Sequence, residues 1–182
     1  MSGPSGVGKS TICREAVKRL DNVYLSVSTT TRPKGENETD GKEYWFTTKE
    51  QFQQKIKQNL LLEYAEVFGN LYGTPKDKVN EALKEGKTVI LEIDVQGAKQ
   101  VKTAYPDALM IFILPPSRKD LAERMNIRGR EDTEAAEIRL NGSGTEIAAA
   151  WQYYENMVIN DDLEQAVKEV VQIIKQNIGE KE

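Results

Sequence analysis

The feature that most constrains the fold of this chain is a glycine-rich segment near its start, at residues 3–10. The segment fits the pattern G-x-x-x-x-G-K-[ST] without a mismatch. Its members are Gly3, Pro4, Ser5, Gly6, Val7, Gly8, Lys9 and Ser10. In such a loop, backbone N–H groups converge on phosphate oxygens, and the helix that follows adds a favourable dipole. The segment therefore predicts a phosphate-binding loop that leads into a helix.

Two side chains at the end of this loop are suited to contact phosphate groups and a metal ion. Lys9 supplies a mobile positive charge for the β- and γ-phosphates of ATP, and the hydroxyl of Ser10 is suited to Mg²⁺. Thr11 follows in the first turn of the helix and belongs to the predicted ATP-binding set. The alternative is a glycine-rich turn that matches the pattern by chance.

The chain offers little before this loop. The pattern normally follows a buried strand, whereas here only Met1 and Ser2 precede Gly3. A loop at the free end of a chain is less pre-organised than one held between a strand and a helix. We therefore expect the start of the chain to be truncated.

Composition excludes several classes of protein. The chain has 182 residues, no histidine and a formal net charge of -4. Histidine-based catalysis and histidine metal sites are therefore impossible, and a general nucleic-acid binder is disfavoured. The lone Cys13 cannot form an internal disulfide, and no apolar run approaches the roughly 20 residues of a membrane span. These features favour a single cytoplasmic domain without a membrane segment.

The hydrophobic pattern predicts helices that alternate with strands. Apolar residues at helical spacing predict helices over 9–20, 48–60, 75–86, 95–103, 117–126 and 163–178. Apolar runs predict strands over 23–27, 60–68, 71–72, 88–93, 108–114 and 157–159. Thr74 is expected to cap the third helix, with Pro75 in its first turn. Buried strands separated by helices indicate an α/β fold with a parallel sheet that helices cover on both faces.

Two carboxylates come at the end of the strand predicted at 88–93. Residues two apart lie on the same side of a strand, so Glu92 and Asp94 are expected to face the phosphate site together. One would reach Mg²⁺ through water, and the other would face an acceptor. The alternative is an ordinary surface-facing strand end.

Several short motifs in one order resemble the guanylate kinase family over essentially the whole chain. They are residues 2–6, 28–32, Tyr44, 63–64, 69–74, 92–97, 115–117, 128–129 and 160–162. The resemblance implies a P-loop NTPase core with a parallel sheet, a small mixed α+β GMP-binding insertion and a helical lid. The implied segments are core 1–28, insertion 29–76, core 77–117, lid 118–145 and core 146–182.

The same resemblance implies which residues bind GMP. They are Ser28, Arg32, Tyr44, Glu63, Tyr72, Thr74 and Asp94. Guanine N1–H and its exocyclic amine are donors that suit the carboxylate of Glu63, and O6 suits the hydroxyl of Ser28 or Thr74. Arg32 would clamp the phosphate. For Glu63 the alternative is an edge-strand charge, and for Trp45 and Phe46 we expect an ordinary core strand.

The chain departs from the family at one phosphate contact. Guanylate kinases resemble one another in carrying a second arginine three residues after the first, and here that position is Gly35. Lys34 offers a point charge without the planar fork of arginine. We therefore expect GMP phosphate to bind more weakly than in relatives with both arginines.

Arginines gather in one segment of the second half. Five of them, Arg118, Arg124, Arg128, Arg130 and Arg139, fall between residues 118 and 139. Similarity to the family assigns Arg124, Arg128 and Arg139 to ATP and to catalysis, and places Asn160 near adenine. A solvated helix face with Arg–Glu pairs is the alternative. Gly142 and Gly144 predict a kink or hinge nearby.

Together these patterns predict a Mg²⁺-dependent guanylate kinase that transfers the γ-phosphoryl group of ATP to GMP directly. The expected catalytic residues are Lys9, Arg32, Arg124, Arg128 and Arg139, and the expected metal contacts are Ser10 and Glu92. No nucleic-acid polymer and no obligatory protein partner are expected. The alternatives are a non-catalytic guanylate-kinase-like binding module and a kinase of another small phosphorylated acceptor.

Overall fold

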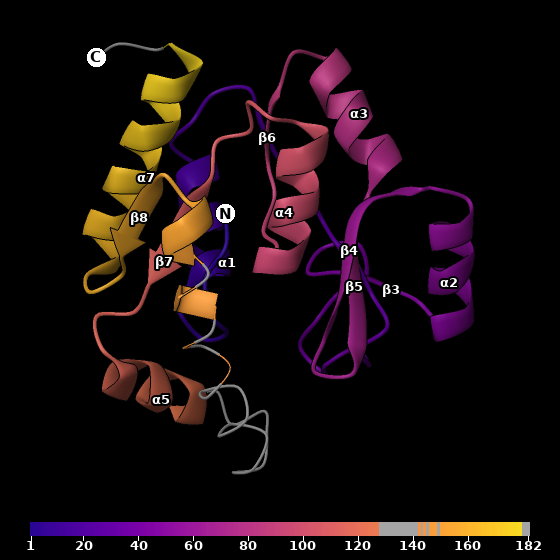
Figure 1. Cartoon of the computed structure of the whole chain (residues 1–182), viewed down its shortest axis with the longest axis horizontal. Helices are drawn as coiled ribbons and strands as arrows, with labels where there is room; N and C mark the ends of the chain where they lie inside the picture. The colour runs from indigo at the N-terminus through magenta and orange to yellow at the C-terminus, as the bar shows by residue number, and fades with distance from the viewer. Residues whose placement is uncertain (128–141, 143, 145, 149, 180–182) are drawn as a thin grey trace. The chain divides into compact units, whose positions relative to one another are not determined.

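The computed structural model divides the chain into two compact units. One comprises residues 22–108, and the other joins residues 1–21 to the segment from 109 onward. The structure describes residues 1–127, 142, 144, 146–148 and 150–179. Figure 1 shows the elements of both units.

The unit that contains the phosphate loop is built on a short parallel sheet. Strands β7 (Ile111–Leu114) and β8 (Asn156–Ile159) pair in parallel, and Ser2 forms a parallel bridge with Phe112 on β7. Helix α1 (Lys9–Val17) follows the loop, and α5 (Arg118–Ile127) follows β7. The chain therefore enters the loop directly from a sheet position.

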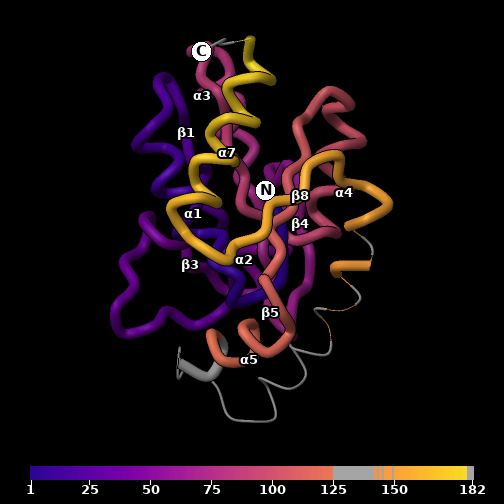
Figure 2. The backbone as a smooth tube through the Cα atoms, turned by 90° about the vertical axis from the view of Figure 1, so that its left-hand side faces the viewer, coloured from indigo at the N-terminus to yellow at the C-terminus, as the bar shows by residue number. Residues whose placement is uncertain are grey.

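Helix α7 (Leu163–Ile178) completes this unit. It packs against both α1 and β8, and Figure 2 shows it running beside α1. Its side chains Val167 and Val170 are fully buried with Phe112 and Val158 of the sheet. The Asp162 side chain caps the helix by accepting from the Gln165 N–H. This apolar packing fixes the two strands from which the site residues of the unit extend.

The second unit also contains a parallel strand pair. Strand β1 (Val23–Leu25) pairs with β6 (Thr88–Ile90) in parallel register. Helix α3 (Lys76–Lys84) packs against β6, and α4 (Val95–Ala104) follows it in the chain. The chain leaves the strand after Ile90, so residues 91–94 form a connection at the carboxyl end of the pair.

A four-stranded sheet forms the rest of this unit. The strands are β2 (Thr29–Thr30), β3 (Trp45–Phe46), β4 (Leu61–Val67) and β5 (Asn70–Pro75), in the order β3-β2-β5-β4. Strands β4 and β5 form an antiparallel hairpin. Helix α2 (Lys49–Lys57) begins with the predicted capping box between Thr48 and Gln51. In Figure 1, α2 and α4 lie on opposite sides of the hairpin.

An irregularity in the hairpin sets the direction of one side chain. Leu61 pairs with Pro75 and Tyr64 with Gly73, so three residues of β4 span the distance covered by two residues of β5. Such bulges change the face on which the following side chain lies. Glu63 thereby lies beside Thr74, and a Cβ at Gly97 of α4 would touch its carboxylate.

Three local predictions are wrong. The strand predicted at 88–93 ends at Ile90, and Asp94 is instead the N-cap of α4, so Glu92 and Asp94 do not continue a strand. Thr74 does not cap α3, because its hydroxyl donates to Glu63 and Pro75 occupies the N-cap. Trp45 lies in a strand but is 42% exposed, so it is not a core residue.

Most other predicted elements are present with shorter bounds. Strand β5 is longer than predicted, α4 and β8 are each one residue longer, and α7 has the predicted bounds. Among the described residues, no helix is both long and apolar enough to cross a membrane.

Candidate functional site

The phosphate loop adopts the strained backbone that its glycines permit. Gly8 is the N-cap of α1 with φ of 102°, a left-handed conformation that favours glycine. A Cβ at Gly8 would also lie 2.5 Å from the side-chain nitrogen of Asn160. Helix α1 begins at Lys9, so Ser10 and Thr11 occupy its first turn as expected. The loop is therefore a helix N-terminus of the kind that binds anions.

The Lys9 side chain turns back over its own loop. Its Nζ donates to the carbonyl oxygens of Gly3, at 2.5 Å, and of Pro4, at 3.1 Å. These carbonyls hold the ammonium group above the loop, where a β- or γ-phosphate oxygen can replace them as its partner. The charge predicted from the pattern thus lies at the loop.

Asn160 supports the loop from behind. It follows β8, it is 6% exposed, and its Nδ2 donates to the carbonyl of Val7 at 2.8 Å. Its own N–H donates to Leu114 on β7. The side chain therefore ties the loop to the sheet, a contact that the predicted role beside adenine does not include.

The second unit contains a buried acid on the hairpin. Glu63 is 3% exposed, and the hydroxyl of Thr74, itself fully buried, donates to its Oε1 at 2.6 Å. The pKa of the Glu63 carboxyl is raised to about 7, mainly by burial; the hydrogen bond from Thr74 opposes this rise, and the charge of Asp94 adds to it. The site holds a carboxylate and a hydroxyl side by side, a pair that can both accept and donate hydrogen bonds.

Helix α4 forms the wall behind this acid. A Cβ built on Gly97 would lie 2.1 Å from Glu63 Oε2, so only glycine leaves room for the carboxylate. Gln100 pins the neighbouring backbone, since its amide accepts from the Tyr64 N–H at 3.2 Å and donates to the Tyr64 carbonyl at 2.7 Å. These bonds satisfy the backbone N–H and carbonyl of Tyr64 at the outer edge of β4, and they hold the neighbouring Glu63 against α4.

Asp94 serves the start of the same helix. Its Oδ1 accepts from the Gly97 N–H at 2.8 Å, and its Oδ2 accepts from the side chain of Gln96 at 3.0 Å. The predicted GMP contact of Asp94 would therefore have to share these oxygens with α4. Ser28, also predicted to contact GMP, is buried in the segment before β2.

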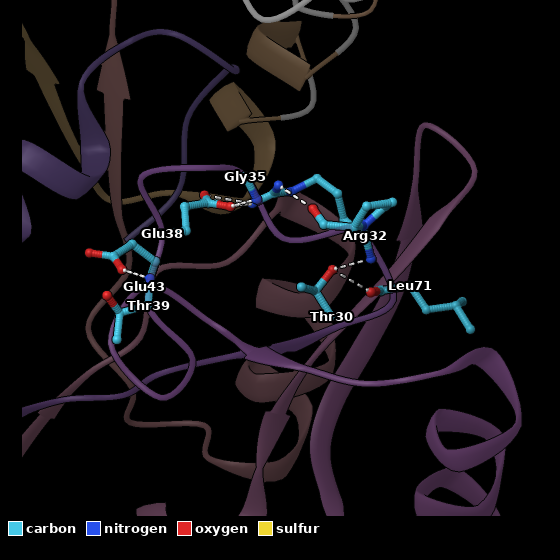
Figure 3. Close-up of polar contacts among 8 residues, drawn as sticks. Thr30, Arg32, Gly35, Glu38, Thr39, Glu43 and Leu71 are labelled. Atoms are coloured by element: carbon cyan, nitrogen blue, oxygen red, sulfur yellow. Dashed lines mark hydrogen bonds and ion pairs between the residues drawn. The ribbon is translucent and has the colours of Figure 1, made fainter.

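The predicted phosphate-binding residues of this unit cluster around Arg32. Its guanidinium carbon lies 5.4 Å from the centroid of the Tyr44 ring, and the Tyr44 and Tyr72 rings meet edge to face at 5.8 Å. Burial raises the pKa of the Tyr44 hydroxyl to about 12, so this group stays a neutral donor at neutral pH. Figure 3 shows Arg32 held by Glu38 and by backbone groups. Lys34, by contrast, is exposed.

Comparison with known proteins assigns this arrangement. The family model described as guanylate kinase matches residues 1–177. The chain belongs to the guanylate kinase family. The match covers nearly the full length of the chain, so both units are included.

Individual guanylate kinases agree with this assignment. A guanylate kinase of Clostridium tetani is 49% identical over 174 residues, which cover 96% of this chain and 83% of that protein. One from Carboxydothermus hydrogenoformans is 47% identical over 174 residues, covering 96% and 85%. A crystal structure of guanylate kinase from Anaplasma phagocytophilum superposes with a TM-score of 0.78 at 30% identity, covering 91% of this chain and 79% of that one. The fold is therefore the α/β P-loop fold of this family.

The predicted ATP-facing arginines lie only in part within the described residues. Arg124 is half-buried on α5, whereas Arg128 and Arg139 lie outside the described residues. Of the predicted hinge, Gly142 and Gly144 are described, and both are helical. The predicted metal contacts Ser10 and Glu92 are both half-buried.

Sequence reasoning missed Glu38, Gly97 and Gln100. Glu38 lies in a polar loop in which acids are ordinary, and the glutamine at 100 looks like a surface residue of a helix. The one available signal was Gly97, a glycine placed inside a helical pattern, which usually has a packing reason.

Proposed function

We propose that this chain transfers the γ-phosphoryl group of ATP to GMP, giving ADP and GDP. The observation that carries the proposal is the buried pair of Glu63 and Thr74, 2.6 Å apart, in a chain that also has a complete phosphate loop. An ionised Glu63 accepts from N1–H and the exocyclic amine of guanine, and a hydroxyl suits O6. Adenine would leave these buried groups unpaired, which is a strong basis for discrimination.

The donor side would follow the chemistry of phosphate loops. Backbone N–H groups of residues 5–10 would surround the β-phosphate, and Lys9 would exchange its loop carbonyls for phosphate oxygens. Among the described residues, no group of three acidic or cysteine side chains could hold a metal by itself. We expect Mg²⁺ to enter with ATP, with the Ser10 hydroxyl as its protein ligand. When bound, the ion neutralises charge that develops on the phosphates.

The acceptor would need positioning rather than activation. The attacking oxygen of the GMP phosphate is already anionic, so no general base is required. Arg32, Tyr44 and Tyr72 would hold that phosphate in the segment 29–76. Arg124, Arg128 and Arg139, in the segment 118–145, would stabilise the transferring group.

A coupled assay of ADP release with GMP, AMP, CMP and UMP tests the proposed reaction. We expect turnover with GMP and little with the other three. Equal rates with AMP would contradict guanine recognition and favour a kinase of another acceptor. Absence of turnover with any acceptor would favour a non-catalytic binding module.

The raised pKa of Glu63 predicts a pH dependence of GMP binding. Guanine needs the ionised acid, and the free site titrates at about 7. The kcat/KM for GMP should therefore fall as pH decreases below 7, by up to about tenfold per unit, and level off above it.

The stability of the fold responds to pH in the opposite sense. Because burial favours the neutral acid, stability from this group is lost as pH rises from 4.5 toward 7.

A phosphate group also titrates near pH 6, so the profile needs a control. The matched control is Glu63→Gln, whose remaining pH dependence belongs to the nucleotide and to other groups. Identical profiles for the two proteins would contradict the assignment of the pKa to Glu63.

Replacing Gly97 with alanine should disturb the acceptor site without disturbing the helix. The new methyl group would displace the carboxylate of Glu63, and we expect a roughly 10- to 100-fold loss of kcat/KM for GMP. Alanine favours helices by about 1 kcal/mol over glycine, which offsets part of the clash. Lys99→Ala, on an exposed part of α4, is the control and should leave KM unchanged. An unchanged KM in Gly97→Ala would show that the carboxylate is not confined there.

A further inference from the structure

Glu38 is a buried acid in a loop of exposed residues. Its side chain is 7% exposed, while Glu36, Asn37, Thr39 and Asp40 around it are exposed. A carboxylate loses much solvation on burial and remains ionised only when it is paired. The hydrogen-bond partners of the Glu38 carboxylate therefore show which group this loop stabilises.

The Glu38 carboxylate accepts hydrogen bonds from a side chain and from a backbone group. Arg32 Nη2 donates to Oε1 at 2.8 Å and to Oε2 at 3.0 Å, and the Gly35 N–H donates to Oε2 at 2.8 Å (Figure 3). The Glu38 N–H donates in turn to the Gly35 carbonyl at 3.2 Å. Residues 35–38 thus form a hydrogen-bonded turn, and the carboxylate of Glu38 binds the guanidinium group of Arg32.

Arg32 is also restrained from its backbone side. Its N–H donates to the hydroxyl of Thr30 at 3.1 Å, and that hydroxyl donates to the Leu71 carbonyl at 3.0 Å. Leu71 precedes Tyr72 on β5, so the backbone of Arg32 is fixed to the strand that carries a predicted phosphate contact. Nη1 donates to the Pro33 carbonyl at 2.8 Å.

These contacts leave part of the guanidinium for an anion. Of its five N–H donors, the contacts found within the described part of the chain engage Nη2 and one N–H of Nη1. Nε–H and the second N–H of Nη1 remain, and the group lies over the Tyr44 and Phe46 rings at 5.4 and 5.7 Å. Arg32 can therefore bind phosphate without releasing Glu38.

We propose that Glu38 is a positioning residue that holds the guanidinium of Arg32 in place for the phosphate of the acceptor nucleotide. This inference rests on the proposed function of the same site. A guanidinium group that is already fixed loses less conformational freedom when it binds an anion.

Glycine at position 35 fits this arrangement. A Cβ there would lie 3.0 Å from Glu38 Oε2, so any side chain would press on the carboxylate that holds Arg32. Glu38 and Gly35 therefore form one unit with Arg32.

The rival reading is that Glu38 competes with phosphate for Arg32. The two readings predict opposite signs in one measurement. If Glu38 positions Arg32, Glu38→Gln weakens GMP binding, whereas if Glu38 competes, the same change strengthens it. The remaining donors on Nε and Nη1 favour positioning.

The test measures affinity for GMP and for guanosine by calorimetry, together with steady-state kinetics. For Glu38→Gln we expect a roughly tenfold higher KM and Kd for GMP, an unchanged kcat and an unchanged Kd for guanosine. Glu38→Asp restores the charge and should recover part of the affinity. In an Arg32→Ala background, Glu38→Gln should have no further effect, because Glu38 acts through Arg32.

Glu43→Gln is the matched control. Glu43 lies in the same loop, and its carboxylate accepts a hydrogen bond from the Thr39 N–H at 2.8 Å. This hydrogen bond does not involve Arg32. Tighter GMP binding by Glu38→Gln would establish competition and overturn the proposal. An equal loss for guanosine and GMP would show a purely structural role and overturn it as well. Failure of the wild-type protein to phosphorylate GMP would count against the proposed function instead.

Discussion

Replacing Lys9 with alanine is expected to lower kcat by about 10²- to 10³-fold while the chain stays folded. The ammonium group is the one charge that the loop holds directly above its own backbone, through the carbonyls of Gly3 and Pro4. In the transfer reaction this charge would move to the β- and γ-phosphates, where negative charge develops. Alanine removes the charge and also the two bonds that close the loop, so KM for ATP should rise too.

The measurement is the coupled ADP-release assay at saturating ATP and GMP, with a thermal unfolding curve for each protein. GMP affinity measured without ATP should be unchanged, because all predicted GMP contacts lie in residues 22–108. Lys18→Ala, an exposed residue just beyond the same helix, is the control. A kcat within threefold of the wild-type value would contradict the role assigned to the phosphate loop.

The second large effect is expected for Glu63→Gln. Glutamine has nearly the same shape and can still accept the Thr74 hydroxyl, but it carries no charge and presents a donor where guanine also presents donors. Losing hydrogen bonds to a charged, buried partner costs about 1.5–3 kcal/mol each. Two such bonds predict a loss of roughly 10²- to 10⁴-fold in kcat/KM for GMP.

Selectivity identifies the cause of that loss. The rate with AMP should change little, so the ratio of GMP to AMP turnover should collapse. Glu66→Gln is the control, because Glu66 lies three residues along the same strand and is exposed. If the ratio is kept while both rates fall together, Glu63 supports the fold rather than base recognition.

Sequence reasoning works well for the phosphate loop because the geometry there is local. Eight consecutive residues contain the glycines, the lysine and the hydroxyl, and α1 begins at Lys9 as the pattern predicts. The cap of α2 at Thr48 is equally local, since its partner Gln51 is only three residues away. The order of helices and strands follows from the same short-range periodicity.

The acceptor site could be predicted only in part, because its geometry depends on distant residues. The resemblance supplied Glu63 and Thr74, but their contact arises from a bulge in β4 that no periodicity shows. A longer strand was predicted because Leu91 and Ile93 are apolar. In the structure the strand ends at Ile90, and Asp94 is the N-cap of the next helix. Glu38 could not be assigned a partner, since many arrangements of a polar loop are compatible with its sequence.

The glycine in α4 has a consequence for attempts to redesign the acceptor. A library that varies only Glu63 keeps a wall at Gly97 in which even an added Cβ would lie 2.1 Å from the carboxylate, so longer or branched replacements for Glu63 have little room. New base preferences should instead come from shortening the acid, for example to aspartate, while position 97 gains the volume that is released. Evolution toward other nucleotides would then proceed through paired changes on the hairpin and the helix. Most single substitutions would not give an active enzyme with a new base preference.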